Sequence, residues 1–118
     1  MRGLVFTVAA AAALSAPALA AHPPTTAERS AILVALPHDV QEIPVKCVRI
    51  VVRVANSRTY ATATPHFLNA THQPCLKYAS NGYWILAKHS GRWKVVFNGS
   101  ELPRCSLHVP RDLIHCLS

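Results

Sequence analysis

Four cysteines in a chain of 118 residues restrict its possible folds more than any other feature. They are Cys47, Cys75, Cys105 and Cys116, and the last two are the closest in sequence. An even number of cysteines in a small exported domain is typical of disulfide bonds. Four cysteines can instead bind zinc, but the sequence has no Cys-x-x-Cys pair to begin such a site. We therefore predict two disulfides and no metal or other cofactor.

The segment 1–20 predicts that the chain is exported. Arg2 provides a positive start, an apolar run extends from Leu4 to Leu14, and small residues stand at Ala18 and Ala20. This order is typical of a secretory signal peptide, and we predict cleavage after Ala20. An uncleaved membrane anchor is the alternative, but a span needs about 20 strongly apolar residues. This run is rich in alanine and is interrupted by polar residues and a proline.

Residues 21–118 then form one small secreted domain, and all four cysteines belong to it. A domain of this length is near the lower limit for a core that is stable without crosslinks. It has eleven Lys and Arg against five acids, a formal charge of +6. A positive exported protein is attracted to anionic surfaces, although the charge can equally serve solubility alone.

Local patterns predict an N-terminal helix in this domain. Thr25 and Glu28 have the spacing of a capping box, so we expect a helix from about 26 to 36 that ends at Pro37. Residues 37–44 are predicted to be a connecting loop, and residues 65–82 a long irregular excursion.

The clearest strand is predicted at 45–55, where Val48, Ile50, Val52 and Val54 point to one face and Arg49 and Arg53 to the other. A second strand at 59–64 is expected to end at Pro65. Two further strands, 83–88 and 93–97, form a hairpin whose turn contains Gly91. A short C-terminal helix is predicted from Pro110. The fold class is thus α+β: a helix packed on a twisted antiparallel sheet of about four strands, a short C-terminal helix and two disulfides.

The disulfide pairing has one geometric indication. Cys75 and Cys105 each lie fifteen residues from Ser90, the centre of the predicted hairpin turn, and antiparallel partners are equidistant from their turn. We therefore predict Cys75 with Cys105, which leaves Cys47 with Cys116. The main alternative pairs Cys105 with Cys116 and closes a short terminal loop.

No catalytic motif is present: the chain lacks a nucleophile elbow, a phosphate-binding glycine loop and a nucleotide fingerprint. His38 beside Asp39 is the one candidate for acid and base catalysis, but neighbours in sequence seldom point toward one another. Most of the seven histidines are expected to be solvated in loops. We predict no catalytic residue and no metal ligand.

A basic outer face of the sheet is the most suggestive binding feature. Arg49 and Arg53 share a side of the first strand, and Lys94 joins them if the hairpin register allows. Such a face can bind an anionic polymer through guanidinium groups, although long basic side chains also solvate ordinary sheets. Four aromatic side chains offer stacking surfaces, or else belong to the core: Tyr60, Tyr83, Trp84 and Trp93.

Several segments carry a family resemblance: the strand with Cys47, Gly82-Tyr83-Trp84-Ile85-Leu86, Gly91-Arg92-Trp93-Lys94-Val95-Val96, Gly99-Ser100, Cys105, Val109-Pro110 and Leu117. With these segments the chain resembles small exported proteins of unknown function that are common in actinobacteria. The hairpin also looks like the closing strands of cystatin-like or nuclear-transport-factor-like folds, which is a likeness of architecture only. Neither resemblance implies a catalytic residue.

The leading functional hypothesis is a non-enzymatic secreted binding module that contacts an anionic surface polymer or an extracellular protein. One alternative is a small extracellular enzyme whose site, in a cavity between helix and sheet, uses a histidine and an acid. Another is an inhibitor of an extracellular enzyme that presents the segment 65–75 braced by Cys75. The lining of any cavity discriminates between binding and catalysis, because acid and base catalysis needs titratable groups there.

Overall fold

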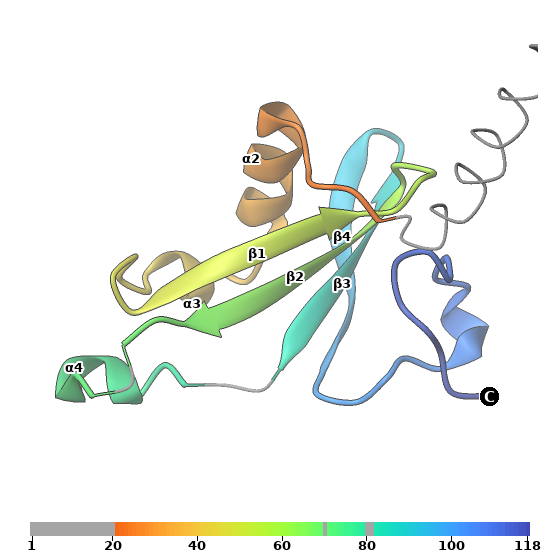
Figure 1. The fold of residues 1–118 in the computed structure, drawn as a ribbon. Coiled ribbons are helices and arrows are strands. Elements are labelled where there is room, and N and C mark those ends of the chain that lie inside the picture. Colours follow the sequence, from red (N-terminus) through yellow and green to blue (C-terminus); the bar gives the residue numbers. More distant parts are fainter. Residues whose placement is uncertain (1–20, 70, 80–81) are drawn as a thin grey trace, which may run out of the picture.

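The computed structural model describes residues 21–69, 71–79 and 82–118 (Figure 1), so the predicted signal peptide lies outside the described residues. One antiparallel sheet has four strands in sequence order, β1-β2-β3-β4. Their bounds are β1 Val48–Val54, β2 Tyr60–Phe67, β3 Tyr83–His89 and β4 Arg92–Gly99. The helices are α2 (Thr26–Ala35), the short α3 (His38–Gln41) and α4 (Gln73–Leu76), with a 3-10 turn at Cys105–Leu107. The α+β class, the four strands and the two disulfides agree with the sequence analysis.

Helix α2 begins with the predicted capping box. The Thr25 hydroxyl accepts a hydrogen bond from the Glu28 backbone N–H (3.1 Å), and the Glu28 carboxylate accepts one from the Thr25 N–H (2.8 Å). The helix ends at Ala35, just before Leu36 and Pro37. The helix starts at Thr26 and so does not lie at the N-terminus of the chain; the N-terminal placement of the helix in the predicted fold is not supported.

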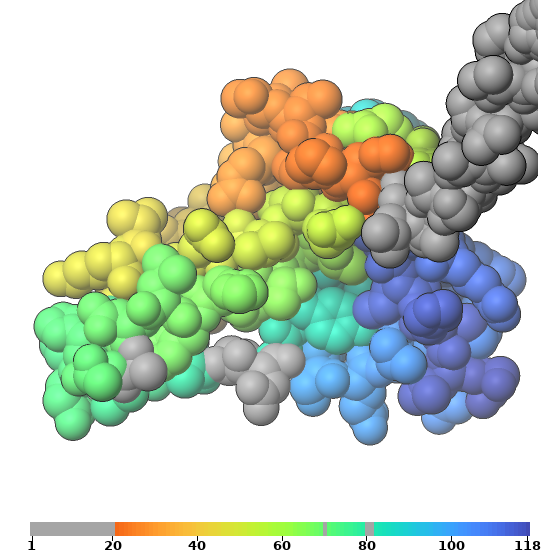
Figure 2. Space-filling model, in the orientation of Figure 1, coloured from red at the N-terminus to blue at the C-terminus, as the bar shows by residue number. Residues whose placement is uncertain are grey.

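The hydrophobic core lies between α2 and one face of the sheet. Alternation in β1 is as predicted, with Val52 and Val54 buried beneath the helix and Arg49 and Arg53 exposed. The core cluster comprises Ile32, Leu36, Val52, Val54, Ala61, Ala63, Leu86 and Trp93. On the other face Thr62, Ile85 and Ala87 are also buried, and the C-terminal segment packs against the strands there (Figure 2).

The hairpin between β3 and β4 is confirmed. Its two turn residues, Ser90 and Gly91, have φ values of 51° and 77°, as expected for a tight turn whose twist matches the strands. A register shift between Ile85 and Leu86 then bends the pair.

Pro65 does not end β2, contrary to our prediction. It pairs with Ile50 and the strand continues to Phe67. Strand β3 pairs with β2 only at residues 60–63, so the nitrogen of Pro65 faces a side that β3 does not reach. Proline is tolerated where no ladder hydrogen bond is needed. The segments predicted as loop and excursion contain two short helices, α3 and α4.

The predicted C-terminal helix is absent. One turn begins after Pro110, where Leu113 N–H bonds to the Pro110 carbonyl (3.0 Å), but it does not continue. Instead Leu117 N–H bonds to the Pro103 carbonyl (2.8 Å), and Cys105 N–H bonds to the Leu117 carbonyl (3.0 Å). A helix from Pro110 to the C-terminus would carry Leu117 away from these partners, because it rises about 1.5 Å per residue.

The preferred disulfide pairing was wrong. The bonds are Cys47–Cys75 and Cys105–Cys116, so the alternative for the last pair is the correct one. The symmetry argument required both flanks of the hairpin to remain in register. However, the β3–β4 ladder ends at Tyr83 and Gly99, and from there α4 and the C-terminal segment lead to opposite ends of the molecule (Figure 1).

Candidate functional site

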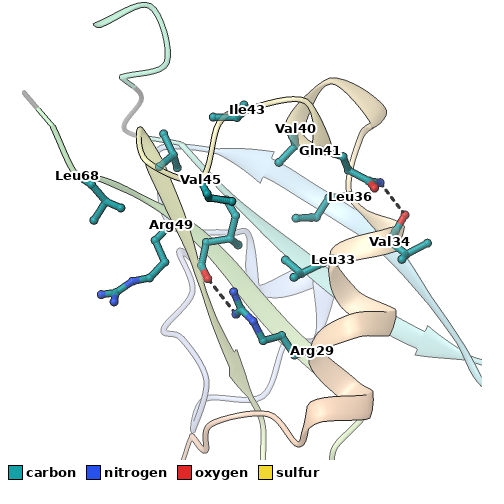
Figure 3. A pocket seen from close by; sticks show the side chains of 12 residues that line it. Arg29, Leu33, Val34, Leu36, Val40, Gln41, Ile43, Val45, Arg49 and Leu68 are labelled. Atoms are coloured by element: carbon teal, nitrogen blue, oxygen red, sulfur yellow. Dashed lines mark hydrogen bonds between the residues drawn. The ribbon is translucent and has the colours of Figure 1, made fainter. Parts of the chain in front are cut away.

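A groove lies between α2, α3 and the outermost strand β1 (Figure 3). Its volume is about 420 Å³, which is within the usual size range of small-ligand sites. Most of its lining is aliphatic. The lining residues are Arg29, Leu33, Val34, Leu36, Val40, Gln41, Ile43, Val45, Val48, Arg49, Ile50 and Leu68.

Three of the aliphatic side chains that line the groove are largely open to solvent. The exposed fractions are 87% for Val45, 71% for Val34 and 48% for Leu68. Single exposed apolar residues are common, but several gathered around one concavity indicate a binding surface. The groove therefore combines solvent access with an apolar wall.

The fold explains why these side chains meet. Helix α2 ends just before Pro37. Helix α3 begins at the next residue, His38, and places Val40 in the lining of the groove. The chain then returns toward β1, where Cys47 bonds to Cys75. Leu68 is held beside β1 because its N–H bonds to the Cys47 carbonyl (2.9 Å). The first disulfide thus braces one end of the groove.

Arginine provides the only formal charge in the lining. The Arg29 guanidinium donates to the Ile50 carbonyl (3.0 Å) and crosses from α2 to β1 at one end of the groove, whereas the Arg49 guanidinium points away from α2 (Figure 3). Gln41 donates to the Val34 carbonyl (3.3 Å). No lining residue is acidic, so the groove favours a ligand with an anionic group.

The outer edge of β1 is partly paired: the Val48 N–H bonds to the Pro44 carbonyl (3.4 Å), and the Ile50 carbonyl accepts from Arg29. At its C-terminal end, His22 and Val54 exchange two backbone hydrogen bonds of 2.8 Å. The direction of the backbone N–H and C=O groups alternates from residue to residue along a strand. Those of Ile50 and Val52 therefore point away from β2, as those of Val54 do. Within the described ranges, the N–H of Ile50 and both backbone groups of Val52 have no hydrogen-bond partner outside the sheet.

The three predicted binding residues share the face opposite α2 but do not form one patch. Arg49 lies beside the groove on β1. Arg53 is on the same strand, and its guanidinium donates to the Ala21 carbonyl (3.0 Å). Lys94 is on β4, at the opposite edge of the four-stranded sheet. Between the two edges lie the buried side chains of β2 and β3, so Lys94 is separated from the arginines.

The aromatic side chains have mainly structural surroundings. Trp93 belongs to the core cluster and Trp84 packs against it. The Tyr83 hydroxyl donates to the Glu101 carbonyl (2.7 Å), and burial raises the pKa of this phenol. Trp93 is buried, and Tyr60, Tyr83 and Trp84 are half-buried.

No histidine and no acid is among the residues that line the groove. The His38 Nε2 atom lies 3.9 Å from the Glu42 carboxylate, and both side chains are exposed. His22 contacts Asn56. Among residues 21–69, 71–79 and 82–118, no group of three His, Cys, Asp or Glu side chains could hold a metal ion.

Sequence reasoning missed this groove because it treated residues 37–44 as a connecting loop. One signal was available. The run Ala31-Ile32-Leu33-Val34 is apolar throughout, and four consecutive helical residues cannot share one face, so the helix has apolar side chains on more than one face. A helix of this kind must bury or expose a second apolar surface.

None of the helices in the described part of the chain has the length and hydropathy needed to span a bilayer. The resemblance to small exported actinobacterial proteins stays a prediction. No protein-family model, no curated protein and no solved structure matches this chain.

Proposed function

We propose that this protein is a non-enzymatic exported binding module whose groove between α2, α3 and β1 binds a ligand that is both apolar and anionic. The observation that carries the proposal is the lining: ten of its twelve residues are uncharged, nine of them aliphatic, and both charged ones are arginines. Apolar walls with a few convergent polar groups are typical of ligand sites.

Simple magnitudes indicate how strong such binding is. Complete burial of one leucine-sized group contributes about 2 kcal/mol, and a hydrogen bond between arginine and a carboxylate adds about 2 kcal/mol. Together they only offset the lower end of the roughly 4–15 kcal/mol that association costs in lost freedom of motion. A ligand that binds tightly therefore needs further contacts with the protein.

Binding is favoured over catalysis by what the groove contains. Its lining has no histidine, acid, serine or cysteine, so no described group there can act as nucleophile or as a general base of ordinary pKa. A groove lined mainly by aliphatic side chains therefore favours the binding hypothesis over the enzyme hypothesis.

Export is part of the proposal. The signal-like segment before Ala21 leads to a domain with two disulfides, and disulfides persist mainly in oxidising compartments. The partner is therefore sought outside the cytoplasm, and an extracellular protein fits an apolar groove better than a purely anionic polymer does. Of the predicted basic residues, Arg49 adjoins this groove.

Fluorescence titration with anilinonaphthalene sulfonate, an apolar anion, tests the proposal. We expect saturable binding that Val45→Glu weakens about tenfold, since it places a charge in the apolar wall. Leu102→Glu is the matched control, because Leu102 is also exposed but lies outside the groove. Absence of binding, or equal binding by both variants, would show that the groove is not the site.

A further inference from the structure

We propose that the natural occupant is an extended peptide of another exported protein, which adds a fifth strand at the outer edge of β1 beside Ile50 and Val52. Its side chains alternate between apolar ones that enter the groove and acidic ones that lie beside Arg49 and Arg53. This inference rests on the proposed function and names the class of partner.

The edge of β1 already accepts an extended segment at one end. His22 pairs with Val54 through two backbone hydrogen bonds. The next residues, Pro23 and Pro24, have no N–H, and the capping box turns the chain into α2 from Thr25 onward. The protein's own segment therefore leaves the edge after one bridge. In the described part of the chain, the N–H of Ile50 and both backbone groups of Val52 remain without a partner, whereas the Val48 N–H bonds to the Pro44 carbonyl (3.4 Å) and Val52 is only 4% exposed.

Hydrogen-bonding groups at this edge match those of a strand. Ile50 and Val52 direct their backbone groups outward, as the His22 bridge and the Arg29 contact both show. Addition of an extended peptide to an exposed edge satisfies such groups and is a recurring mode of peptide recognition. Three residues opposite Ile50–Val52 span about 10 Å.

Arg29 occupies one of these groups in the free protein. Its guanidinium donates to the outward carbonyl of Ile50, which a peptide N–H would otherwise use. A side chain that covers an edge carbonyl also protects the edge from unwanted pairing. Peptide binding therefore requires Arg29 to release this carbonyl. Until it does, the Arg29 side chain blocks strand pairing at this position.

The two faces of β1 determine the alternation in the peptide. Directly opposed residues of paired strands project to the same face. Peptide side chains opposite Val48 and Ile50 therefore point toward α2 and the groove. Those opposite Arg49 and Val51 point to the other face, where Arg49 and Arg53 give β1 positive charge and no acid. Acidic residues at these alternate positions gain opposite-charge pairs across the strands, directly or diagonally.

The test uses synthetic hexapeptides that alternate Glu with Val or Leu, added to the full secreted protein and followed by amide NMR. We expect binding together with slower hydrogen exchange of the Ile50 and Val52 amides. Methylation of the backbone nitrogens that face β1 leaves every side chain unchanged, and we expect it to weaken binding about tenfold or more.

A charge exchange tests the orientation of the peptide. Arg49→Glu is expected to weaken binding of the Glu peptides several-fold and to strengthen binding of peptides with Lys in place of Glu, at about the same magnitude. Lys94→Glu, at the far edge of the sheet, is the control and should change neither. An amide spectrum that keeps its dispersion shows that each variant is folded.

The outcomes separate the two proposals. If methylated and unmethylated peptides bind equally, or if no peptide binds while anilinonaphthalene sulfonate still binds in a manner sensitive to Val45→Glu, strand addition is wrong and the groove remains a ligand site. If the anionic probe also fails to bind in the groove, the proposed function itself is wrong.

Discussion

Glu28 is the residue with the most perturbed acidity in the described part of the chain, and its environment explains why. The Arg58 guanidinium donates two hydrogen bonds to its carboxylate (2.5 and 2.9 Å), and the Thr25 N–H donates a third. These contacts, chiefly the bonds from Arg58, lower the pKa of Glu28 from 4.5 to about 2. Arg58 has a φ of 60°, so the ion pair also joins α2 to a residue in the left-handed region of the β1–β2 turn.

Replacement of Glu28 should make the free energy of unfolding less dependent on pH. Because the carboxylate has a lower pKa in the folded protein, its contribution is complete above about pH 4.5 and is lost as the pH falls toward 2. We expect Glu28→Gln to lower the free energy of unfolding by about 1 kcal/mol at pH 7 and by much less near pH 2. Urea unfolding at both pH values measures this difference. The exposed Glu42→Gln variant should match the parent protein, and a constant deficit for Glu28→Gln at both pH values would contradict the assignment.

The two disulfides differ in the elements that they connect and in the length of the loop that each closes. Cys47–Cys75 ties the start of β1 to α4 within a small buried cluster, and closes a loop of 28 residues. Cys105–Cys116 closes a loop of 11 residues at the C-terminus, and its cysteines are half-buried. A longer loop loses more entropy when it is crosslinked in the unfolded chain.

Removal of the first disulfide should therefore be the more costly change. We expect Cys47→Ser with Cys75→Ser to lower the free energy of unfolding by about 4 kcal/mol, and Cys105→Ser with Cys116→Ser by about 3 kcal/mol. The first pair should also disturb the groove, since the disulfide fixes the position of Cys47, whose backbone carbonyl accepts the hydrogen bond from Leu68. Chemical denaturation and titration with the apolar anion measure both effects. A larger loss from the second pair would show that the C-terminal segment stabilises the fold more than the Cys47 cluster does.

For the whole molecule, export and oxidation make one joint prediction. We expect the secreted protein to begin at Ala21 and, in its oxidised form, to be lighter by four hydrogens than after reduction, because two disulfides form. Intact-mass spectrometry with and without alkylation measures both, and peptide mapping should yield a linked Cys47–Cys75 fragment. A product that retains the segment before Ala21, or that has free thiols, would contradict export by this route.

The two edges of the sheet differ in their surroundings. The sheet is covered by α2 on one face, and partly by the C-terminal segment on the other (Figures 1 and 2). The apolar groove opens at the β1 edge, far from the edge formed by β4. Binding at the β1 edge therefore leaves β4 and its Lys94 free, which is why this lysine serves as a control.

Local features of this protein were readable from its sequence because each depends on neighbouring residues. The capping box at Thr25 and Glu28, the alternation of β1 and the turn at Ser90 and Gly91 all involve residues within a few positions of one another. Their geometry follows from backbone sterics and from the periods of helix and strand. The α+β class followed from the order of these elements.

Only the tertiary structure decided the disulfide partners, the course of the C-terminal segment, the continuation of β2 through Pro65 and the groove. Each depends on where distant parts of the chain come to lie. Cys75 meets Cys47 because α4 lies beside the start of β1, and Pro65 is tolerated because β3 stops short of it. The groove needs α2, α3 and the edge of β1 together. Periodicity in a sequence indicates which face of an element is apolar, whereas the long-range packing of the elements determines which apolar face remains uncovered.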